Sequence, residues 1–308
     1  MSLRARLPRA LRRLLFVDVW NVGLVEAPIA AFLAPGFRPE VRWLPHAGPG
    51  RLSADPFALE HAGRWWVLYE ALEHAEGRGY LVARELLSDG GFGPERAVLR
   101  QPFHLSYPYL IQDAGELYCV PESHEAGEVA LYRATRFPEG WERVTALLLG
   151  FRGIDSTFLR HAGRWWCFTT EKGNGHDRAL FLFHAAELRG PWQPHARNPV
   201  ALDPRSARGA GTPFVHEGKL YRPAQDCSRI HEERVTLSRI VELTPETFRE
   251  ELVTTVEPLG HGPWPHKLHT LSAAGARTLV DGCRETFLLS DPRLLLFKLR
   301  RALARSRR

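Results

Sequence analysis

Hydrophobic and polar residues repeat along this chain in a strand–turn–strand pattern. The two clearest copies are residues 53–70, SADPFALEHAGRWWVLYE, and residues 153–170, GIDSTFLRHAGRWWCFTT. In each copy an apolar run leads to a glycine, Gly63 or Gly163, and an aromatic and β-branched run follows it. Glycine readily takes the positive φ of a tight hairpin, so each copy predicts two antiparallel strands joined by a short turn.

Three weaker copies of the pattern surround Gly115, Gly218 and Gly275. The five hairpin glycines are spaced 52, 48, 55 and 57 residues apart. A repeat of this length, built from short strands, is typical of the blades of a propeller. The sequence therefore predicts an all-β fold, a five-bladed β-propeller formed as one domain by residues 46–285.

Both ends of the chain are basic. Residues 1–13 carry five arginines and no acid, and residues 293–308 carry six arginines and one lysine and no acid. We expect short basic helical tails at both termini: residues 1–45 would hold a basic segment and a strand that closes the ring, and residues 286–308 a basic amphipathic helix. Such a helix either packs on the outer blades or attaches to an anionic membrane surface or an acidic partner protein.

The net charge of +6 conceals an acidic body. Setting aside the twelve basic residues of the two ends leaves 29 basic residues against 35 acidic ones. An acidic body argues against nucleic acid as the ligand of the main site. Asp18, Asn21 and Glu26 interrupt the first apolar run, which therefore predicts neither a signal peptide nor a membrane span. We expect a cytoplasmic protein, either free or associated with a membrane.

Four cysteines lie in different repeats without the spacing of a metal site. They are Cys119, Cys167, Cys227 and Cys283. This distribution favours buried free thiols over a zinc site. No dinucleotide or phosphate-binding loop is present in the sequence either, so no cofactor is predicted from motifs.

Polar residues recur where the inner strand of each blade would begin and the second strand would end. These two positions lie side by side in an antiparallel hairpin. The expected pairs are Asp55 with Glu70, Tyr107 with Glu122, Asp155 with Glu171, Gly211 with Asp226, and His269 with Asp281. They predict an acidic mouth at one end of the central channel. Any single acid of the set could instead simply end a strand and face solvent.

Converging carboxyl groups are what glycosidic bond chemistry requires. One gives a proton to the leaving oxygen, and another activates water or attacks the sugar. The catalytic candidates are Asp55, Asp155, Glu122 and Glu171. Asp55 and Asp155 hold equivalent places in blades one and three, across the channel, which would favour inversion over retention.

A second set of side chains could bind substrate at the channel mouth. Its members are Glu70, His104, Tyr107, Arg208, Arg222, Asp226 and His269. Structural roles stay open for several of them. His104 is as well suited to bonding the backbone as to holding a sugar, and Arg208 could bind a phosphate or carboxylate of a substrate or pair with Asp155 or Asp226.

The ADPFAL and IDSTFL runs, each followed by GRWW, resemble the five-bladed propellers of glycoside hydrolase family 43 and its relatives. The resemblance implies that Asp55 is a general base and that Asp155 tunes the general acid. The acid of that family is a Glu in an EGP motif, and this chain has Gly211, Thr212 and Pro213 there instead. A histidine in the region of His269 helps to hold a cation or water in those enzymes, so a calcium or sodium ion in the channel is a further expectation.

A second resemblance covers residues 20–282. The motifs HLSYP at 104–108, VPES at 120–123, GPW at 190–192, LYRPAQDC at 220–227, and HTL at 269–271 with Asp281 and Gly282 resemble the N-terminal propeller domain of glucosamine inositolphosphorylceramide transferases. It implies involvement with glycans or glycolipids.

Three classes of function follow from these residues. The first is a hydrolase or transferase that acts on a glycan or glycolipid precursor through the mouth carboxylates. The second is a non-catalytic glycan-binding or accessory subunit of a glycosyltransferase system. The third is a propeller recruited to non-sugar biosynthetic chemistry, since a fold does not determine a function.

Overall fold

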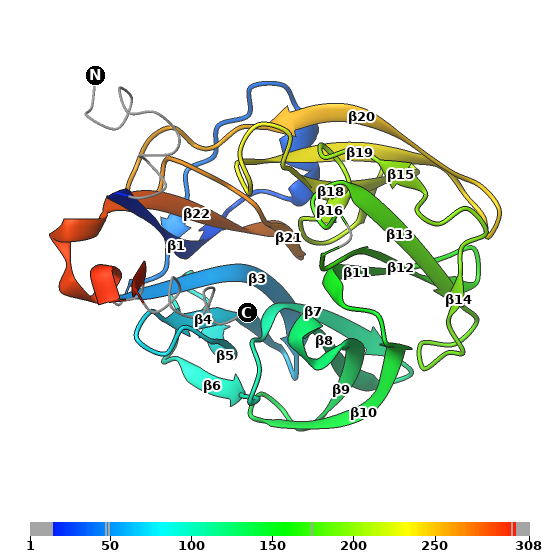
Figure 1. The fold of residues 1–308 in the computed structure, drawn as a ribbon, viewed down its shortest axis with the longest axis horizontal. Coiled ribbons are helices and arrows are strands. Elements are labelled where there is room, and N and C mark those ends of the chain that lie inside the picture. Colours follow the sequence, from blue (N-terminus) through cyan, green and yellow to red (C-terminus); the bar gives the residue numbers. More distant parts are fainter. Residues whose placement is uncertain (1–14, 47, 49, 174, 297, 300–308) are drawn as a thin grey trace.

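The protein is a five-bladed β-propeller, in which five antiparallel sheets surround a common axis (Figure 1). The computed structural model describes residues 15–299 apart from residues 47, 49, 174 and 297. The predicted all-β, five-bladed architecture is thereby confirmed.

Blades one to four follow one another along the chain, and in each the inner strand comes first. Blade one comprises β3 (Arg51–His61), β4 (Arg64–Glu73), β5 (Gly79–Leu86) and β6 (Arg96–Leu99). Blade two comprises β7 (Ser106–Asp113), β8 (Glu116–Glu122), β9 (Glu128–Arg136) and β10 (Gly140–Leu149). Blade three comprises β11 (Gly153–His161), β12 (Arg164–Glu171), β13 (Ala179–Ala185), β14 (Gln193–Pro194) and β15 (Ala201–Leu202). Blade four comprises β16 (Arg208–Gly209), β17 (Phe214–His216), β18 (Lys219–Asp226), β19 (Arg234–Leu243) and β20 (Phe248–Val256).

Blade five joins the two ends of the described chain. Its order from the axis outward is β21 (Leu271–Ala274), β22 (Arg277–Phe287), β1 (Phe16–Val25) and β2 (Arg42–Trp43). β1 pairs with β22 along its full length, from Phe16 opposite Phe287 to Val25 opposite Thr278. Figure 1 shows the two strands side by side, in dark blue and in brown-orange. The ring is thus closed by backbone hydrogen bonds between distant parts of the sequence.

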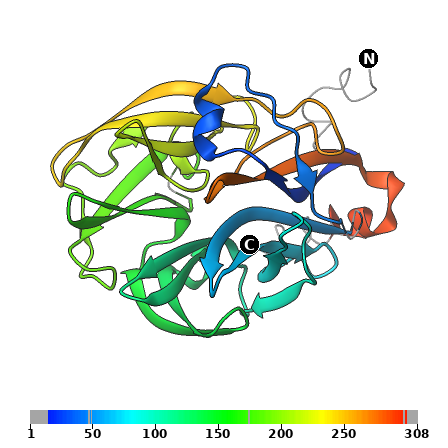
Figure 2. The same cartoon turned by 180° about the vertical axis from the view of Figure 1, so that it is seen from behind.

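Within the part of the chain that the structure describes, three short 3-10 helices accompany the strands: η1 (Ile29–Leu33), η2 (His124–Ala126) and η3 (Leu288–Ser290). η1 lies between β1 and β2 and is visible from behind, in blue (Figure 2). Its Ile29 and Phe32 are buried in one apolar cluster with Phe214 and Tyr221 of blade four.

The prediction of basic helical tails at both termini is not supported. Residues 1–14 lie outside the described residues, and the described chain enters at the strand β1, whose run FVDVWNVGLV favours the extended backbone. Near the other end the described helical residues are 292–296 and 298–299, in a short segment that follows η3. Among the described residues no helix is long and apolar enough to cross a membrane.

The hairpin turns explain why glycine marks the repeat. In blades one and three the two turn residues both have positive φ, 51° at Ala62 and 71° at Gly63, and 50° at Ala162 and 75° at Gly163. This is the geometry of a type I′ turn, whose twist matches that of the flanking strands. The Gly positions meet open space, so backbone conformation rather than packing selects glycine there.

We expect Gly211→Ala to destabilise the fold much more than Gly218→Ala. Gly211 has φ of 123°, and an added Cβ would lie 1.9 Å from the carbonyl oxygen of Leu271 in blade five. Gly218 also has positive φ but faces open space. Urea unfolding should give a loss of about 3 kcal/mol or more for Gly211→Ala and about 1 kcal/mol for Gly218→Ala. Equal losses would contradict the close contact between blades four and five.

Candidate functional site

The inner strands of blades one, two and three share a β-bulge that aims one residue of each strand away from the regular ladder. The register shifts between Ala54 and Phe57 in β3, and at the equivalent places in β7 and β11. Asp55, Tyr107 and Asp155 stand at these bulges with φ of 55°, 44° and 47°. Left-handed backbone is unfavourable for such residues and is concentrated at functional sites in proteins.

The strand register also decides which acids lie beside the bulges. Glu70 stands opposite Ala54, and Glu122 stands opposite Ser106, so the two glutamates are equivalent. In blade three the equivalent position, opposite Ile154, is occupied by Thr170. Glu171 is one residue further along the strand, opposite Gly153. Side chains alternate between the faces of a strand, so Glu171 is directed away from the place of the other two glutamates and is half-exposed.

Asp55 is held by residues of blade five. Its Oδ1 accepts a hydrogen bond from Thr270 Oγ1 at 3.2 Å and lies 3.1 Å from His269 Nε2. The other ring nitrogen of His269 lies 2.9 Å from Asp281 Oδ2. Asp281 in turn accepts hydrogen bonds from the backbone N–H groups of Asp55, His269 and Thr270. His269 is therefore fixed between two buried carboxyl groups.

Burial by itself would lower the pKa of His269, but the adjacent Asp281 and Asp55 carboxylates outweigh burial and hold that pKa well above its usual range. The imidazolium is therefore the form that this pocket stabilises. Hard cations such as calcium take many oxygen ligands. Here the Asp55 and Asp281 carboxylates already accept hydrogen bonds from Thr270 and from backbone N–H groups, so the group does not fit the calcium or sodium ion expected from the sequence.

Asp155 is held by residues of blade four. Its Oδ2 accepts hydrogen bonds from Arg208 Nε at 2.5 Å and from Gln225 Nε2 at 2.8 Å. Burial raises the pKa of Asp155, and Glu122 and Asp55 add to this effect, while Arg208 opposes it. Of the two roles open to Arg208 in the sequence, the structure shows the pairing with Asp155.

Glu70 and Glu122 are buried together but have opposite electrostatic surroundings. Burial and the nearby Asp55 and Glu122 carboxylates raise the pKa of Glu70 well above its usual range. Burial alone would also raise the pKa of Glu122. The hydrogen bond with His124 Nδ1, 2.7 Å from Glu122 Oε1, and the charge of Arg208 outweigh burial and lower that pKa to about 2. Glu70 thus holds its proton to a higher pH than Glu122 does.

His104 lies at the same place. Its Nε2 is 3.4 Å from Glu70 Oε1, and its Nδ1 accepts a hydrogen bond from the backbone N–H of Gly79 at 3.0 Å. Burial lowers its pKa, so the imidazole is largely uncharged at neutral pH. Of the two roles considered from the sequence, the structure shows the bond to the backbone, and it also places the ring beside Glu70.

Tyr107 uses its hydroxyl group within the protein. The oxygen lies 2.9 Å from Thr157 Oγ1 and accepts a hydrogen bond from the backbone N–H of Gly211 at 2.7 Å. The side chain is fully buried. It thus links blade two to blades three and four.

Arg222 and Asp226 are engaged elsewhere in blade four. Arg222 pairs with Glu250 of β20 at 2.8 Å and donates to the carbonyl oxygen of Ser206. Asp226 pairs with Arg234 at 2.9 Å and accepts hydrogen bonds from Ser228. Their contacts connect strands of the blade to one another, so the structure does not bring these two residues together with Asp55 and Glu70.

Three residues that the sequence did not single out as candidates join the site. His124 of η2 contacts Glu122, Gln225 of β18 donates to Asp155, and Glu232 comes from the loop between β18 and β19. Glu232 Oε1 lies 3.0 Å from His231 Nε2 and 3.8 Å from Arg208 Nη2. Burial opposes ionisation of Glu232, but His231, His269 and Arg208 hold its pKa well below its usual range. The backbone of Glu232 has a positive φ of 58°, which is uncommon for a residue other than glycine.

These residues form one group, which we name the central cluster. Its members are Asp55, Glu70, His104, Glu122, His124, Asp155, Arg208, Gln225, Glu232, His269 and Asp281. The cluster places carboxyl groups of raised and of lowered pKa and fixed cations within electrostatic reach of one another. Such an arrangement can transfer protons.

Solved structures of two glycoside hydrolases have the same fold at low sequence identity. The catalytic domain of the Coprinopsis cinerea GH62 α-L-arabinofuranosidase has a TM-score of 0.57 and 13% identity, over 75% of this chain and 81% of that chain. Zg3597, a family 117 glycoside hydrolase of the marine bacterium Zobellia galactanivorans, has a TM-score of 0.53 and 12% identity, over 76% of this chain and 85% of that chain. These likenesses concern the fold alone.

Similarity in sequence is more specific. Residues 44–262 match the family model described as glucosamine inositolphosphorylceramide transferase 1, N-terminal. The transferase of that name from Arabidopsis thaliana is 32% identical over 253 residues, 77% of this chain and 33% of the relative, and the one from Oryza sativa subsp. japonica is 33% identical over 208 residues, 66% of this chain and 28% of the relative. The chain spans about a third of the length of these relatives. It belongs to the family defined by the N-terminal domain of glucosamine inositolphosphorylceramide transferase 1.

Proposed function

We propose that this protein acts on a glycan or a lipid-linked sugar through the carboxyl groups of the central cluster. Its family and the hydrolase-like propeller support a carbohydrate-related role. The names of its relatives specify glucosamine and inositolphosphorylceramide, and we carry over from them only the class of substrate. Hydrolysis of a glycosidic bond and transfer of a sugar are both compatible with the cluster.

The observation that carries the proposal is the separation of the Glu70 and Glu122 pKa values within one buried group. Two carboxyl groups pushed apart in this way mark the proton donor and the charged partner of an acid–base pair. Glu70 then gives a proton to the leaving oxygen. Asp55, aimed by its bulge and held by His269 and Thr270, acts as the base that activates water or an acceptor hydroxyl.

Glu122 and Asp155 set the electrostatic field in this scheme. Glu122 is a neighbouring negative charge that helps to keep the proton on Glu70. Asp155 keeps Arg208 in place beside the acids. We assign Glu171 no role in proton transfer, since the register directs it to the other face of β12.

A non-catalytic glycan-binding role is the second candidate. It is favoured by the protein partners that Asp155, Glu122 and Asp55 already have, and by the absence of a glutamate at residues 211–213. In that role the cluster would serve as a fixed set of hydrogen-bonding groups for sugar hydroxyls.

Screening nucleotide sugars and aryl glycosides for turnover tests these two roles. If Asp55 is the base, Asp55→Asn should lower turnover by about 10²-fold or more. Asp113→Asn is the matched control, because Asp113 lies at the far end of an inner strand and pairs with Arg160. Undiminished turnover in Asp55→Asn would remove Asp55 from the mechanism, and sugar binding without any turnover would favour the second role.

Glu70→Gln and Glu122→Gln should change stability in opposite ways. The raised pKa of Glu70 means that its ionisation opposes folding as pH rises above about 4.5, so Glu70→Gln should be at least as stable as wild type at pH 7. The lowered pKa of Glu122 gives stability that is present above about 4.5 and lost as pH falls towards 2, so Glu122→Gln should lose about 3 kcal/mol at pH 7.

Urea unfolding at pH 7 and pH 4 measures both effects. Glu116→Gln, on the same strand as Glu122 but exposed, should change stability by less than about 0.5 kcal/mol. A Glu70→Gln protein that is several kcal/mol less stable than wild type would show that Glu70 is ionised in the folded state.

We further propose that the basic ends attach the protein to an anionic membrane that carries its substrate. Each basic residue near such a surface contributes about 1 kcal/mol. Truncation is a poor test, because Leu294 is fully buried against β1 and Leu72. Replacing Arg300, Arg301, Arg305, Arg307 and Arg308 by Gln should lower flotation with anionic liposomes at least tenfold, and the five Lys replacements should preserve it. Binding that is equal for both variants, or insensitive to salt, would contradict the proposal.

A further inference from the structure

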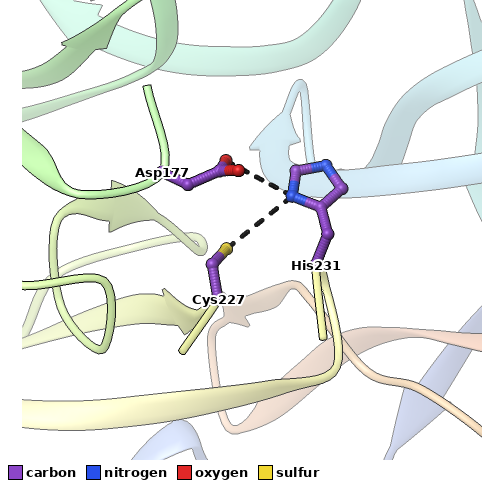
Figure 3. A group of neighbouring side chains, drawn as sticks. All are labelled: Asp177, Cys227 and His231. Carbon is purple, nitrogen blue, oxygen red and sulfur yellow. Dashed lines mark hydrogen bonds and ion pairs between the residues drawn. The ribbon is translucent and has the colours of Figure 1, made fainter. Parts of the chain in front are cut away.

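A second group of chemically reactive side chains lies beside the central cluster. Asp177 comes from the loop after β12 in blade three, and Cys227 and His231 come from the loop after β18 in blade four. Figure 3 shows the carboxyl group of Asp177 and the sulfur of Cys227 pointing toward the same nitrogen of His231. Residues of two blades thus converge on one point.

The separations match a tetrahedral metal site. His231 Nδ1 lies 3.3 Å from Asp177 Oδ1 and 3.9 Å from Cys227 Sγ, and the three ligand atoms all lie within 4.8 Å of one another. Zinc bonds of about 2.0 Å to nitrogen and oxygen and about 2.3 Å to sulfur place neighbouring ligand atoms roughly 3.3–3.6 Å apart. The sulfur needs to move toward Nδ1 by a few tenths of an ångström to reach this range, and its separation from the Asp177 carboxylate lies within 4.8 Å.

The other nitrogen of His231 has the partner that a metal-bound histidine requires. His231 Nε2 lies 3.0 Å from Glu232 Oε1, the arrangement in which a carboxylate orients the ring and fixes the tautomer that leaves Nδ1 free to bind a metal. Arg208 Nη1 lies 3.2 Å from the same Nε2 and 3.4 Å from Asp177 Oδ1. A protonated Nε2 cannot accept from a guanidinium, so in this tautomer Arg208 interacts with the Asp177 and Glu232 carboxylates instead.

We propose that Asp177, Cys227 and His231 bind one Zn²⁺ ion and leave its fourth position open. A thiolate, an imidazole and a carboxylate together select zinc over calcium or magnesium, which bind oxygen ligands. Three protein ligands with one open position characterise zinc sites that take up water or a ligand oxygen. Asp177 and His231 are partly exposed, with 34% and 40% of their side chains accessible, so an ion can enter from solvent. The site does not depend on the function proposed for the central cluster.

Zinc titration of untagged, chelator-treated full-length protein against a competing chelator dye tests the site. We expect one equivalent of Zn²⁺ to bind, and Cys227→Ser and His231→Gln each to weaken its affinity at least tenfold. His216→Gln is the matched control, since His216 lies in β17 of the same blade and outside the group. Wild-type affinity in either ligand variant, or no stoichiometric binding, would overturn the proposal.

Cys227 offers two further readouts. All four cysteines belong to the described residues, and Cys227 is the one that is not buried. Zn²⁺ should therefore slow the reaction of Cys227 with a thiol reagent. Co²⁺ should give a thiolate-to-metal charge-transfer band that Cys227→Ser lacks. A Co²⁺ complex without this band, or thiol reactivity unchanged by Zn²⁺, would show that the ion binds elsewhere and that the three residues form only an ion-paired group.

Discussion

Charge compensation between neighbouring blades is the constraint on which the centre of this propeller depends. A charge buried without a partner costs several kcal/mol, so every acid near the axis needs a cation or a set of donors. The partners of Asp55, in blade one, are His269 and Thr270 of blade five. The partners of Asp155, in blade three, are Arg208 and Gln225 of blade four. Asp55 therefore gains its partners only when blade five completes the ring, whereas Asp155 needs only the neighbouring blade four.

Much of this arrangement could be predicted from the sequence because the repeat records it. A type I′ turn requires positive φ, which leaves a glycine such as Gly63 or Gly163 at each hairpin, so the number of blades follows from spacing. Asp55 and Asp155 stand in nearly identical sequence contexts, and the structure gives them the same bulge and nearly the same φ. Where the local sequence repeats, the local structure repeats with it.

The remaining features could not be predicted because they depend on register and on contacts between loops. A shift of one residue directs Glu171 away from the place that Thr170 takes, and no hydrophobic pattern specifies register to that precision. Glu232 and His231 lie in a loop without periodicity. The spacing of the cysteines gave no sign of a metal site because one of the three proposed ligands, Asp177, comes from a different blade.

The pairing of β1 with β22 has a consequence for how the protein folds during synthesis. β1 is synthesised before the other described strands, yet its partner β22 is synthesised after all of them. Until then the run FVDVWNVGLV offers an unpaired, apolar strand edge, the kind of surface that recruits chaperones or other chains. Contacts of such high sequence separation also slow folding. The propeller is therefore completed only when β1, the first described strand to be synthesised, pairs with β22, the last.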